Sequence, residues 1–515
     1  IPAVPAVAEH VFVVVVVGGG GTGLAASIEA RNQGRRVALL EKNPVLGGST
    51  GRSIGSISAT NTPHQIRHGI KDCPEHHSED LAKFNAVCGF PDNAELRRVL
   101  TANVPETVRW LMSMGVRFYG PMPEPPHRLP RMHNVLPNSG AYIYHLERHA
   151  RRIGVDIFPS MPAKRLIQRD GRVVGVETED PSGRRHVFIG RGGVVLASGD
   201  YSANEDFKAR FTSRDIARIG PTTPTNTGDG HQMAMELGGK VLNGAFMAAV
   251  IKCVAPKRKK FVHLLPPATW MTGFINWSME NLPPRILRPF VMSFMTTVLS
   301  ISPKLFDAGA ILVNQQGRRF GDELETPVLS ISRQSEQTAY FIFDGAVAKR
   351  FSAWPHFVST APGIAYAYVP DYRRTRPDIV KVARSPEALA RKMGVPAEAL
   401  RQTFEAYNAG TDGIGTATRD KRWHGSLSEP PFYALGPVKS VVNLTDGGLA
   451  IDAQMQVLGE DDQPIPGLYA AGSAGQGGLL LEGHGHHLGW AFTSGRIAGR
   501  NAAYSVVSEP TVAAS

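Results

Sequence analysis

The stretch VFVVVVVGGGGTGLAASIEARNQGRRVALLEK, from Val11 to Lys42, decides the fold. Its uniform apolar run Val13 to Val17 predicts a central parallel strand that is buried on both faces. A glycine-rich turn follows, a helix is expected over Leu24 to Asn32, and RRVALLEK predicts a second strand that ends in Glu41. Strand, turn, helix and strand in this order predict a Rossmann-like α/β fold.

The glycines of this turn fit the pattern G-x-G-x-x-G at Gly18, Gly20 and Gly23. Gly18 permits a tight turn, Gly20 lets the backbone approach a pyrophosphate, and Gly23 brings the helix against the strand. Glu41 can accept hydrogen bonds from ribose hydroxyls. The pattern therefore predicts a dinucleotide site, and by itself it leaves NAD and FAD open.

The continuation NPVLGGSTGRSIGSISAT, from Asn43 to Thr60, offers a second set of backbone amides and hydroxyls at Gly48, Ser49 and Thr50. A cofactor that extends beyond the first turn explains this second set better than a cofactor that ends there. The continuation thus favours FAD.

Length and composition indicate an ordinary globular protein of two domains. The chain has 515 residues, which exceeds the roughly 250 to 300 at which single cores stop growing. It is 42% hydrophobic and 20% charged. The net charge of +11 is scattered along the chain, and no aromatic-rich recognition motif accompanies it, so nucleic-acid binding is not expected.

The cysteines and the first residues indicate the cellular compartment of the protein. Cys73, Cys88 and Cys253 are widely spaced, which predicts neither a disulfide framework nor a zinc knuckle and favours a reducing compartment. The chain opens with Ile1 and lacks the pattern of a signal peptide, although an upstream segment could have been removed. We expect a cytoplasmic protein, with membrane association as an open alternative.

One apolar segment suggests that alternative. PFVMSFMTTVLSIS, from Pro289 to Ser302, is uncharged and flanked by Arg285, Arg288 and Lys304. It is shorter than the ~20 residues that a spanning helix requires. A buried helix is expected, and an interfacial patch or greasy substrate entrance with peripheral membrane contact is the second interpretation.

Seven segments, in their order and spacing, resemble the FAD-dependent fumarate reductase/succinate dehydrogenase flavoprotein superfamily, which includes ketosteroid and tricarballylate dehydrogenases. They are VVGGGGTGLAASIEA, LEKNPVLGGST, VVLASGDYSANE, TNTGDGHQMAMELGG, ILVNQQGRRFGDE, MGVPAEALRQTFEAYNAG and GLYAAGSAGQGG with GRIAGRNAA. The resemblance implies a Rossmann-like FAD-binding domain interrupted by an α+β cap domain that holds part of the substrate site. The FAD domain would comprise residues 1–251 and 432–515, and the cap residues 252–431.

The resemblance also implies how FAD is held. Relatives that attach FAD covalently use a histidine in the loop after the GGST-like stretch, where this chain has STGRSIGS, so FAD should be noncovalent. The expected cofactor-binding residues are Gly18, Gly20, Gly23, Glu41, Lys42, Gly48, Ser49, Thr50, Ala163, Ser198, Gly199, Asp229, Gly472 and Leu488.

The stretch LLLEGHGHHLGW, from Leu479 to Trp490, is the main candidate for chemistry. By resemblance it lines the flavin, and the amides near His487 and Leu488 with the helix dipole would stabilise negative charge on the reduced ring. We expect no metal site, because successive side chains on a glycine-rich loop need not converge and no fourth ligand is evident. The candidate acid/base residues are His484, His486, His487, Glu482 and, from the presumed loop GVRFYG, Tyr119.

Departures from the family pattern affect the expected substrate. Fumarate-reducing relatives carry an arginine where this chain has His487, a histidine where it has Asn443, and a proton-donating arginine near its Thr326 and Pro327. Ketosteroid dehydrogenases match the C-terminal spacing better, but their acid/base tyrosines fall near Leu481 or Glu482 and near Pro327 of this chain.

We therefore expect an enzyme that oxidises, or in reverse reduces, a C–C bond beside a carbonyl, with a hydrophobic or cyclic ketone preferred. The alternative is an oxidoreductase for a carboxylate substrate, which Arg333, Arg128 or Arg131 would clamp. A structural or redox-sensing FAD is the non-enzymatic alternative. No second cofactor domain is evident, so electrons should pass to a separate quinone, flavin or redox protein, or to oxygen.

Overall fold

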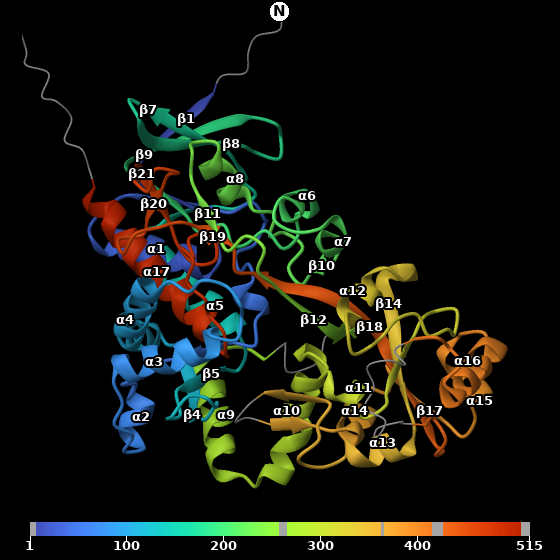
Figure 1. Cartoon of the computed structure of the whole chain (residues 1–515). Helices are drawn as coiled ribbons and strands as arrows, with labels where there is room; N and C mark the ends of the chain where they lie inside the picture. The colour runs from blue at the N-terminus through green and yellow to red at the C-terminus, as the bar shows by residue number, and fades with distance from the viewer. Residues whose placement is uncertain (1–6, 257–264, 362–364, 415–425, 506–515) are drawn as a thin grey trace, which may run out of the picture.

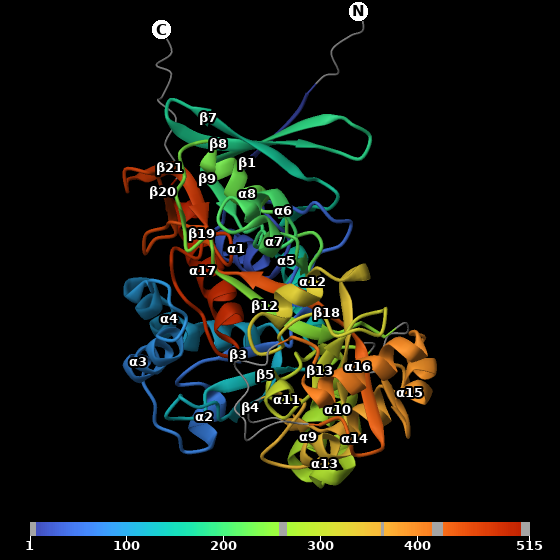
Figure 2. The same ribbon diagram turned by 45° about the vertical axis from the view of Figure 1, so that its right-hand side comes forward.

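A computed structural model describes residues 7–256, 265–361, 365–414 and 426–505. Figure 1 shows a parallel sheet with its helices in the upper part and a second sheet with its helices at the lower right. Figure 2 shows the same two bodies, with the long strand β18 running from one toward the other. The cavity described below lies between them.

The first sheet contains the motif that opens the chain. Its order is β20-β21-β9-β1-β2-β6, with β7 and β8 attached beside β9. Strand β1 pairs in parallel with β2 and β9, and β9 pairs in parallel with β21. The expected Rossmann-like sheet is confirmed. The strands are β1 (Ala8–Val17), β2 (Val37–Leu40), β6 (Asp156–Phe158), β7 (Ala163–Arg169), β8 (Arg172–Glu179), β9 (Arg185–Leu196), β20 (Gln456–Leu458) and β21 (Pro464–Ala470).

Two helices from opposite ends of the chain pack together beside this sheet. They are α1 (Gly21–Asn32), which begins earlier than the expected Leu24, and α17 (His486–Tyr504). Their backbones are very close, since a Cβ on Gly499 would lie 2.0 Å from the carbonyl oxygen of Ala26. This packing brings the N-terminus of α17 to the edge of the sheet where β1 ends.

The second sheet has the order β10-β18-β14-β13, and β12 and β17 also pair with β18. Its strands are β10 (Gly220–Pro221), β12 (Met247–Cys253), β13 (Ile311–Val313), β14 (Thr338–Phe343), β17 (Val380–Ala383) and β18 (Phe432–Thr445). The boundary expected after residue 251 falls within β12, and the one before residue 432 coincides with the start of β18. The domain ranges 1–251, 252–431 and 432–515 stay a prediction.

Smaller sheets complete the strands: β3 (Ser56–Ser58) with β5 (Met132–Leu136) and β4 (Arg117–Met122), β11 (Val241–Leu242) with β19 (Gly448–Leu449), and β15 (Ser359–Ala361) with β16 (Ala365–Ala367). Tyr119 lies in β4, where it pairs with Asn134 of β5. The expectation that GVRFYG is a loop was therefore wrong, because Arg117 to Gly120 belong to the strand that pairs with β5.

The remaining helices surround the two main sheets. The stretch from Pro386 to Ala409 forms two helices separated at Gly394, which has φ +78°. The remaining α-helices are α2 (Pro63–Arg67), α3 (Pro74–Asn85), α4 (Ala94–Ser113), α5 (Gly140–Ile153), α6 (Glu205–Ala209), α7 (Arg214–Ala217), α8 (Asp229–Met235), α9 (Thr269–Asn281), α10 (Pro284–Val298), α11 (Lys304–Asp307), α12 (Pro327–Ser332), α13 (Gly345–Arg350), α14 (Val369–Thr375), α15 (Pro386–Met393) and α16 (Ala397–Ala409), with 3₁₀ turns at Thr50–Arg52 and Ser335–Gln337.

The apolar segment from Pro289 to Ser302 forms most of α10. Met292 and Met295 are buried in the core of the second sheet, which confirms the expected buried helix for that face. Phe290 is 64% exposed, so the first turns of the helix are not buried. Among the described residues, no helix is both long enough and apolar enough to cross a bilayer.

Candidate active site

The main cavity has a volume of about 1050 Å³ and lies where the first sheet meets the second. Its walls include the ends of β1 and β2 at Val17 and Leu40, the loop after β9, strands β12 and β18, and the first turn of α17. Segments from both ends of the chain and from its middle therefore face one space. This position, at the carboxyl ends of parallel strands, is where open α/β sheets bind ligands.

The glycines of the first motif form one wall. Gly18 has φ +110°, and a Cβ on Gly23 would lie only 1.8 Å from the carbonyl oxygen of Gly18, so α1 packs directly against the turn. A Cβ on Gly20, by contrast, would meet no protein atom nearer than 3.9 Å. Bare backbone at Gly20 and Gly48 thus faces open space at the N-terminus of α1, which fits the diphosphate of a dinucleotide.

The acidic residue after β2 completes this wall. Glu41 accepts hydrogen bonds from the backbone N–H of Gly19 and from the backbone and side-chain nitrogens of Asn43, each at 2.7 Å. Lys42 Nζ donates to Asp229 Oδ2 at 2.8 Å. Glu41 is therefore fixed at the cavity wall with remaining acceptor capacity, as a ribose hydroxyl would require.

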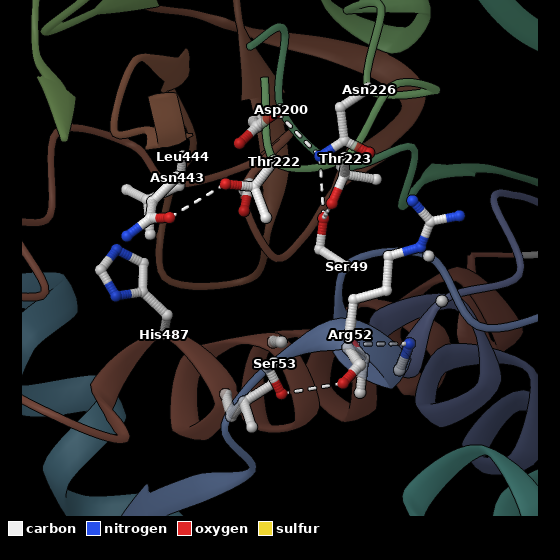
Figure 3. A pocket seen from close by; sticks show the side chains of 18 of the residues that line it. Ser49, Arg52, Ser53, Asp200, Thr222, Thr223, Asn226, Asn443, Leu444 and His487 are labelled. Carbon is white, nitrogen blue, oxygen red and sulfur yellow. Dashed lines mark hydrogen bonds between the residues drawn. The ribbon is translucent and has the colours of Figure 1, made fainter. Parts of the chain in front are cut away.

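Buried polar side chains join the GGST stretch to the loops before α8 (Figure 3). Asn226 Nδ2 donates to Ser49 Oγ at 2.9 Å and to Asp200 Oδ1 at 2.8 Å, and Ser49 Oγ donates to Thr223 Oγ1 at 3.0 Å. Burial raises the pKa of Asp200, although four hydrogen bonds to its carboxylate, including one from Ser202 Oγ, oppose this effect. The network holds three segments in one geometry around the cavity.

Most of the expected cofactor residues line this cavity. Gly23 and Gly472 lie behind the wall instead: a Cβ on Gly472 would lie 2.3 Å from Thr22 Oγ1, so both glycines permit close packing and do not face the ligand space. The expected residues that line the cavity are Gly18, Gly20, Glu41, Lys42, Gly48, Ser49, Thr50, Ala163, Ser198, Gly199, Asp229 and Leu488.

The residues expected for acid/base chemistry separate into two groups. Glu482, His484 and His487 line the cavity, whereas His486 and Tyr119 do not. His486 is buried on the other side of the loop, where its Nδ1 donates to the carbonyl oxygen of Glu482 at 2.6 Å. The consecutive histidines therefore point to different surroundings.

His486 belongs to a buried cluster with His77 and His127. The Nε2 atoms of His77 and His486 are 3.2 Å apart. Arg131 Nη1 donates to His127 Nδ1 at 2.9 Å, so a neutral His127 carries its proton on Nε2 and offers no second lone pair. Burial lowers the pKa of His127 to about 4 and that of His486 to about 3, which keeps both rings uncharged. The absence of a resident metal stays a prediction.

His487 lies in the first turn of α17 and interacts with a buried carboxylate. Its Nε2 is 2.8 Å from Asp446 Oδ1, and Asp446 is fully buried. Burial lowers the pKa of His487, but the carboxylates of Asp446, Glu482 and Asp200 together outweigh this effect, so the net shift is upward. Figure 3 shows His487 beside Asn443 on one side of the cavity, opposite Ser49 and Arg52. Asp446 thus favours the protonated form of His487 in the first turn of α17.

His484 is fixed by a different acid. Its Nδ1 lies 2.5 Å from Glu124 Oε1, and its backbone N–H donates to both oxygens of Glu124 at 3.1 Å. Glu124 is 4% exposed, while 32% of the His484 side chain is exposed. The carboxylate orients the imidazole, and Nε2 is left for a ligand.

Lys252, on β12, adds a cation that the sequence analysis did not single out. It lines the main cavity and a second, adjoining one of about 390 Å³, as His484 and Asn443 also do. Burial lowers its pKa. Within the described parts of the chain, no carboxylate lies within 4.0 Å of its ammonium group, in contrast to Lys42 and Asp229. A charged residue within the otherwise apolar strand MAAVIKC was the available signal.

The arginines considered as carboxylate clamps lie elsewhere. Arg333 pairs with Asp215 at the surface, and Arg128 and Arg131 both pair with Asp80 outside the cavity lining. Their carboxylate partners are already within the fold. The basic residues that do line the cavity are Lys42, Arg52, Lys252, Lys439, His484 and His487.

Comparisons with known proteins agree with this geometry. The family model described as "FAD binding domain" matches residues 13–480. The chain is 26% identical to the NADH:fumarate oxidoreductase of Klebsiella pneumoniae over 89% of its own length, but that match covers only 44% of the relative. It is 27% identical to a fumarate reductase (cytochrome) of Shewanella frigidimarina, over 95% of this chain and 76% of the relative. The chain thus spans about half the length, or less, of the first relatives it matches.

Solved structures give the same fold. The open conformation of a flavocytochrome c3 fumarate reductase superposes with a TM-score of 0.72 at 25% identity, over 98% of this chain and 80% of that chain. A 3-ketosteroid Δ4-(5α)-dehydrogenase of Rhodococcus jostii gives 0.59 at 25% identity, over 96% and 97%. Since the family model covers most of the sequence and the cavity fits the cofactor, the chain belongs to the FAD-binding family of fumarate reductase and succinate dehydrogenase flavoproteins.

Proposed function

We propose that the protein is a flavin-dependent reductase of C=C bonds conjugated to a carboxylate. The observation that carries this proposal is the position of Lys252, which lines both cavities and has no carboxylate partner among the described residues. Bound FAD in its reduced form would supply a hydride. The relatives named for fumarate, acrylate and urocanate reduction support this class of reaction.

Lys252 would bind the substrate carboxylate and stabilise the negative charge that develops on it. A hydride that arrives at the β-carbon of an enoate drives electron density toward the carboxylate, and a nearby ammonium lowers the energy of that charge. Because Lys252 lies in a partly desolvated wall, its interaction with an anion is stronger than it would be in water.

His484 would then deliver the proton that completes the reduction. Its Nδ1–H is held by Glu124, so Nε2–H of the imidazolium is the group that can protonate the α-carbon. One hydride and one proton convert the enoate to the saturated acid, and His484 recovers its proton from solvent through its exposed edge. His487 and Asp446 have a different role, which is to maintain positive charge at the N-terminus of α17.

The adjoining cavity favours a substrate with an apolar part. Its wall includes Ile54, Val298, Leu299, Ile301 and Phe357. The junction between the two cavities carries Lys252, so a substrate anchored there could extend an alkyl or aryl group into the second space. This arrangement retains the expected hydrophobic substrate but replaces the ketone with a carboxylate.

The hypothesis of a ketone substrate, which the sequence favoured, has weaker support. Ketosteroid dehydrogenases are found among the solved structures, whereas the named sequence relatives above are reductases of unsaturated acids. The loop residue Glu482, whose pKa burial raises, is the group here that could protonate a ketone oxygen. A substrate carboxylate would neutralise the charge of Lys252, whereas a ketone would only accept a hydrogen bond from it.

FAD is proposed to be noncovalent, and its electrons to come from a separate donor. The loop STGRSIGS, residues 49–56, contains no histidine for covalent attachment. Trichloroacetic acid should therefore release the flavin into the supernatant. Relatives whose names include NADH or a cytochrome support an external donor.

The test of the proposed function uses the intact flavoprotein, photoreduced without oxygen. We expect crotonate, cinnamate or fumarate to restore the oxidised flavin band and yield the saturated acid, and 2-cyclohexenone to do so far more slowly. Reoxidation by the enone alone would overturn the proposal in favour of the ketone reading, and reoxidation by none of these compounds would reject both.

A substitution sharpens this test. Lys252→Met keeps the length of the side chain and removes its charge. We expect KM for cinnamate to rise about 10- to 150-fold, from the roughly 1.5–3 kcal/mol that a hydrogen bond to a charged group contributes. Lys381→Met on β17, where Nζ binds only backbone carbonyls at the surface, is the matched control. Equal KM values for both variants would exclude Lys252 from substrate binding.

A further inference from the structure

Helix α9 presents its aromatic residues to the outside. Trp270 is 70% exposed, Phe274 60% and Trp277 52%, and their spacing of four and three places them on one face of the helix. Its buried residues are Thr272 and Ser278. An ordinary surface helix has the reverse pattern, with its apolar stripe toward the core.

The start of α10 extends this surface. Ile286 is 50% exposed and Phe290 64%, one helical turn apart, while Met292 further along is buried. We call Trp270, Phe274, Trp277, Ile286 and Phe290 the aromatic face. In Figures 1 and 2 the α9–α10 hairpin forms the lower end of the molecule, opposite the end where β7 and β8 lie.

Single exposed apolar residues are common in proteins, but a group of this kind is not. Large exposed apolar side chains elsewhere belong to separate elements, such as Val45 before the GGST stretch, Val87 after α3 and Tyr504 at the end of α17. Five on two consecutive helices indicate a surface that is covered in the working protein.

We propose that the aromatic face docks on the surface of an anionic lipid bilayer. Tryptophan and phenylalanine are the side chains that suit the boundary between headgroups and acyl chains. The charge of this part of the sequence suits anionic lipid: residues 257–290 contain six Lys and Arg, among them the exposed Arg285 in the first turn of α10, and one acid, Glu280. The contact is interfacial, since neither helix is long and apolar enough to span a membrane.

Continuity with the cavity supports the same assignment. Helix α10 carries Phe290 of the aromatic face on one turn and Thr297 and Val298 of the cavity wall at its other end. Docking would therefore place the helix that lines the cavity in contact with the bilayer, within reach of apolar molecules dissolved there. This inference does not depend on the proposed reaction.

The experiment is co-sedimentation of the purified holoprotein with vesicles of phosphatidylcholine containing one quarter phosphatidylglycerol, compared with phosphatidylcholine alone. We expect binding to the anionic vesicles that weakens in 0.5 M salt. In the triple variant Trp270→Ser, Phe274→Ser and Trp277→Ser, partitioning should fall at least about 100-fold, because each buried apolar side chain contributes roughly a tenfold factor.

Tyr504→Ser is the matched control, since Tyr504 is also 64% exposed but lies at the far end of α17. Its partitioning should equal that of the wild type, and visible spectra should show full FAD content in every variant. No binding of the wild type, or equal binding of the triple variant, would overturn the proposal. A wild-type dimer in sedimentation velocity that the triple variant lacks, without vesicle binding, would show that a second copy covers this face.

Discussion

The two parts of the main cavity are built in different ways. The part at Gly18, Gly20 and Glu41 comes from one continuous stretch of chain, and bare backbone forms most of its wall. The part at Lys252, His484 and His487 comes from segments more than two hundred residues apart, and side chains form it. The first part is suited to a group common to the whole family, and the second to the substrate of this particular chain.

The difference shows which part of a flavoprotein tolerates change. A backbone wall depends on close packing, so a single methyl group can disrupt it. A side-chain wall can exchange residues while the fold persists, and His487 and Asn443 stand at positions where the resemblance implies an arginine and a histidine. Four predictions test this contrast, ordered by the size of the expected effect.

His484→Gln should have the largest effect, because it removes the proposed proton donor from the side-chain part. We expect kcat for enoate reduction to fall about 10²- to 10⁴-fold, the usual contribution of general acid catalysis, with KM and FAD content little changed. Stopped-flow reoxidation of the reduced flavin measures this rate. His76→Gln at an exposed position is the control, and an unchanged rate in His484→Gln would assign the proton to another group.

Gly23→Ala tests the backbone part. The added Cβ would lie 1.8 Å from the carbonyl oxygen of Gly18, so α1 must move away from the turn. Overpacking of this kind costs about 1–3 kcal/mol, and we expect the Kd for FAD to rise about 5- to 150-fold in fluorescence titration. Gly273→Ala, which would meet no atom within 4 Å, should leave FAD affinity unchanged. Equal affinities would contradict the close-packed wall.

Asp446→Asn tests the charge at the N-terminus of α17. Asp446 raises the pKa of His487, so the pair stabilises the fold fully below the unfolded histidine value near 6.5, and this contribution is lost as pH rises through the folded pKa. The variant should lower that pKa, which shifts the alkaline loss of stability to lower pH. The midpoint of urea unfolding, measured from pH 6 to 9, should show this shift. Asp462→Asn, at an exposed ion pair with Lys240, should leave the profile in place.

His127→Gln should have the smallest effect. It should change the pH dependence of stability below pH 7, whereas Asp446→Asn changes it above pH 7. Burial lowers the pKa of His127 to about 4, so its contribution is present above pH 6.5 and lost as pH falls toward 4, because the unfolded chain then binds a proton that the folded chain excludes. The variant should reduce the slope of unfolding free energy against pH by up to about 1.4 kcal/mol per unit in that range. A slope identical to that of wild type would contradict a neutral cluster.

Sequence alone determined the Rossmann-like sheet, the dinucleotide turn and the preference for FAD. Each of these depends on backbone contacts within about thirty neighbouring residues, such as the close contact of Gly23 with Gly18. Contacts of this kind require glycines at fixed intervals, and those intervals can be recognised in the sequence. The loop from Leu479 to Trp490 was located in the same way, through its glycines before α17.

The tertiary structure decided which side chains of that loop can act. His487 faces the cavity while His486 faces His77, because the first turn of α17 rotates successive residues by about 100°, and His484 faces the cavity from the loop before the helix. It also decided that Lys252 and Glu124 join them, and that the arginines expected as clamps pair elsewhere. These outcomes depend on strand register and helix packing between segments far apart in sequence, where one residue of register exchanges a wall residue for a core residue.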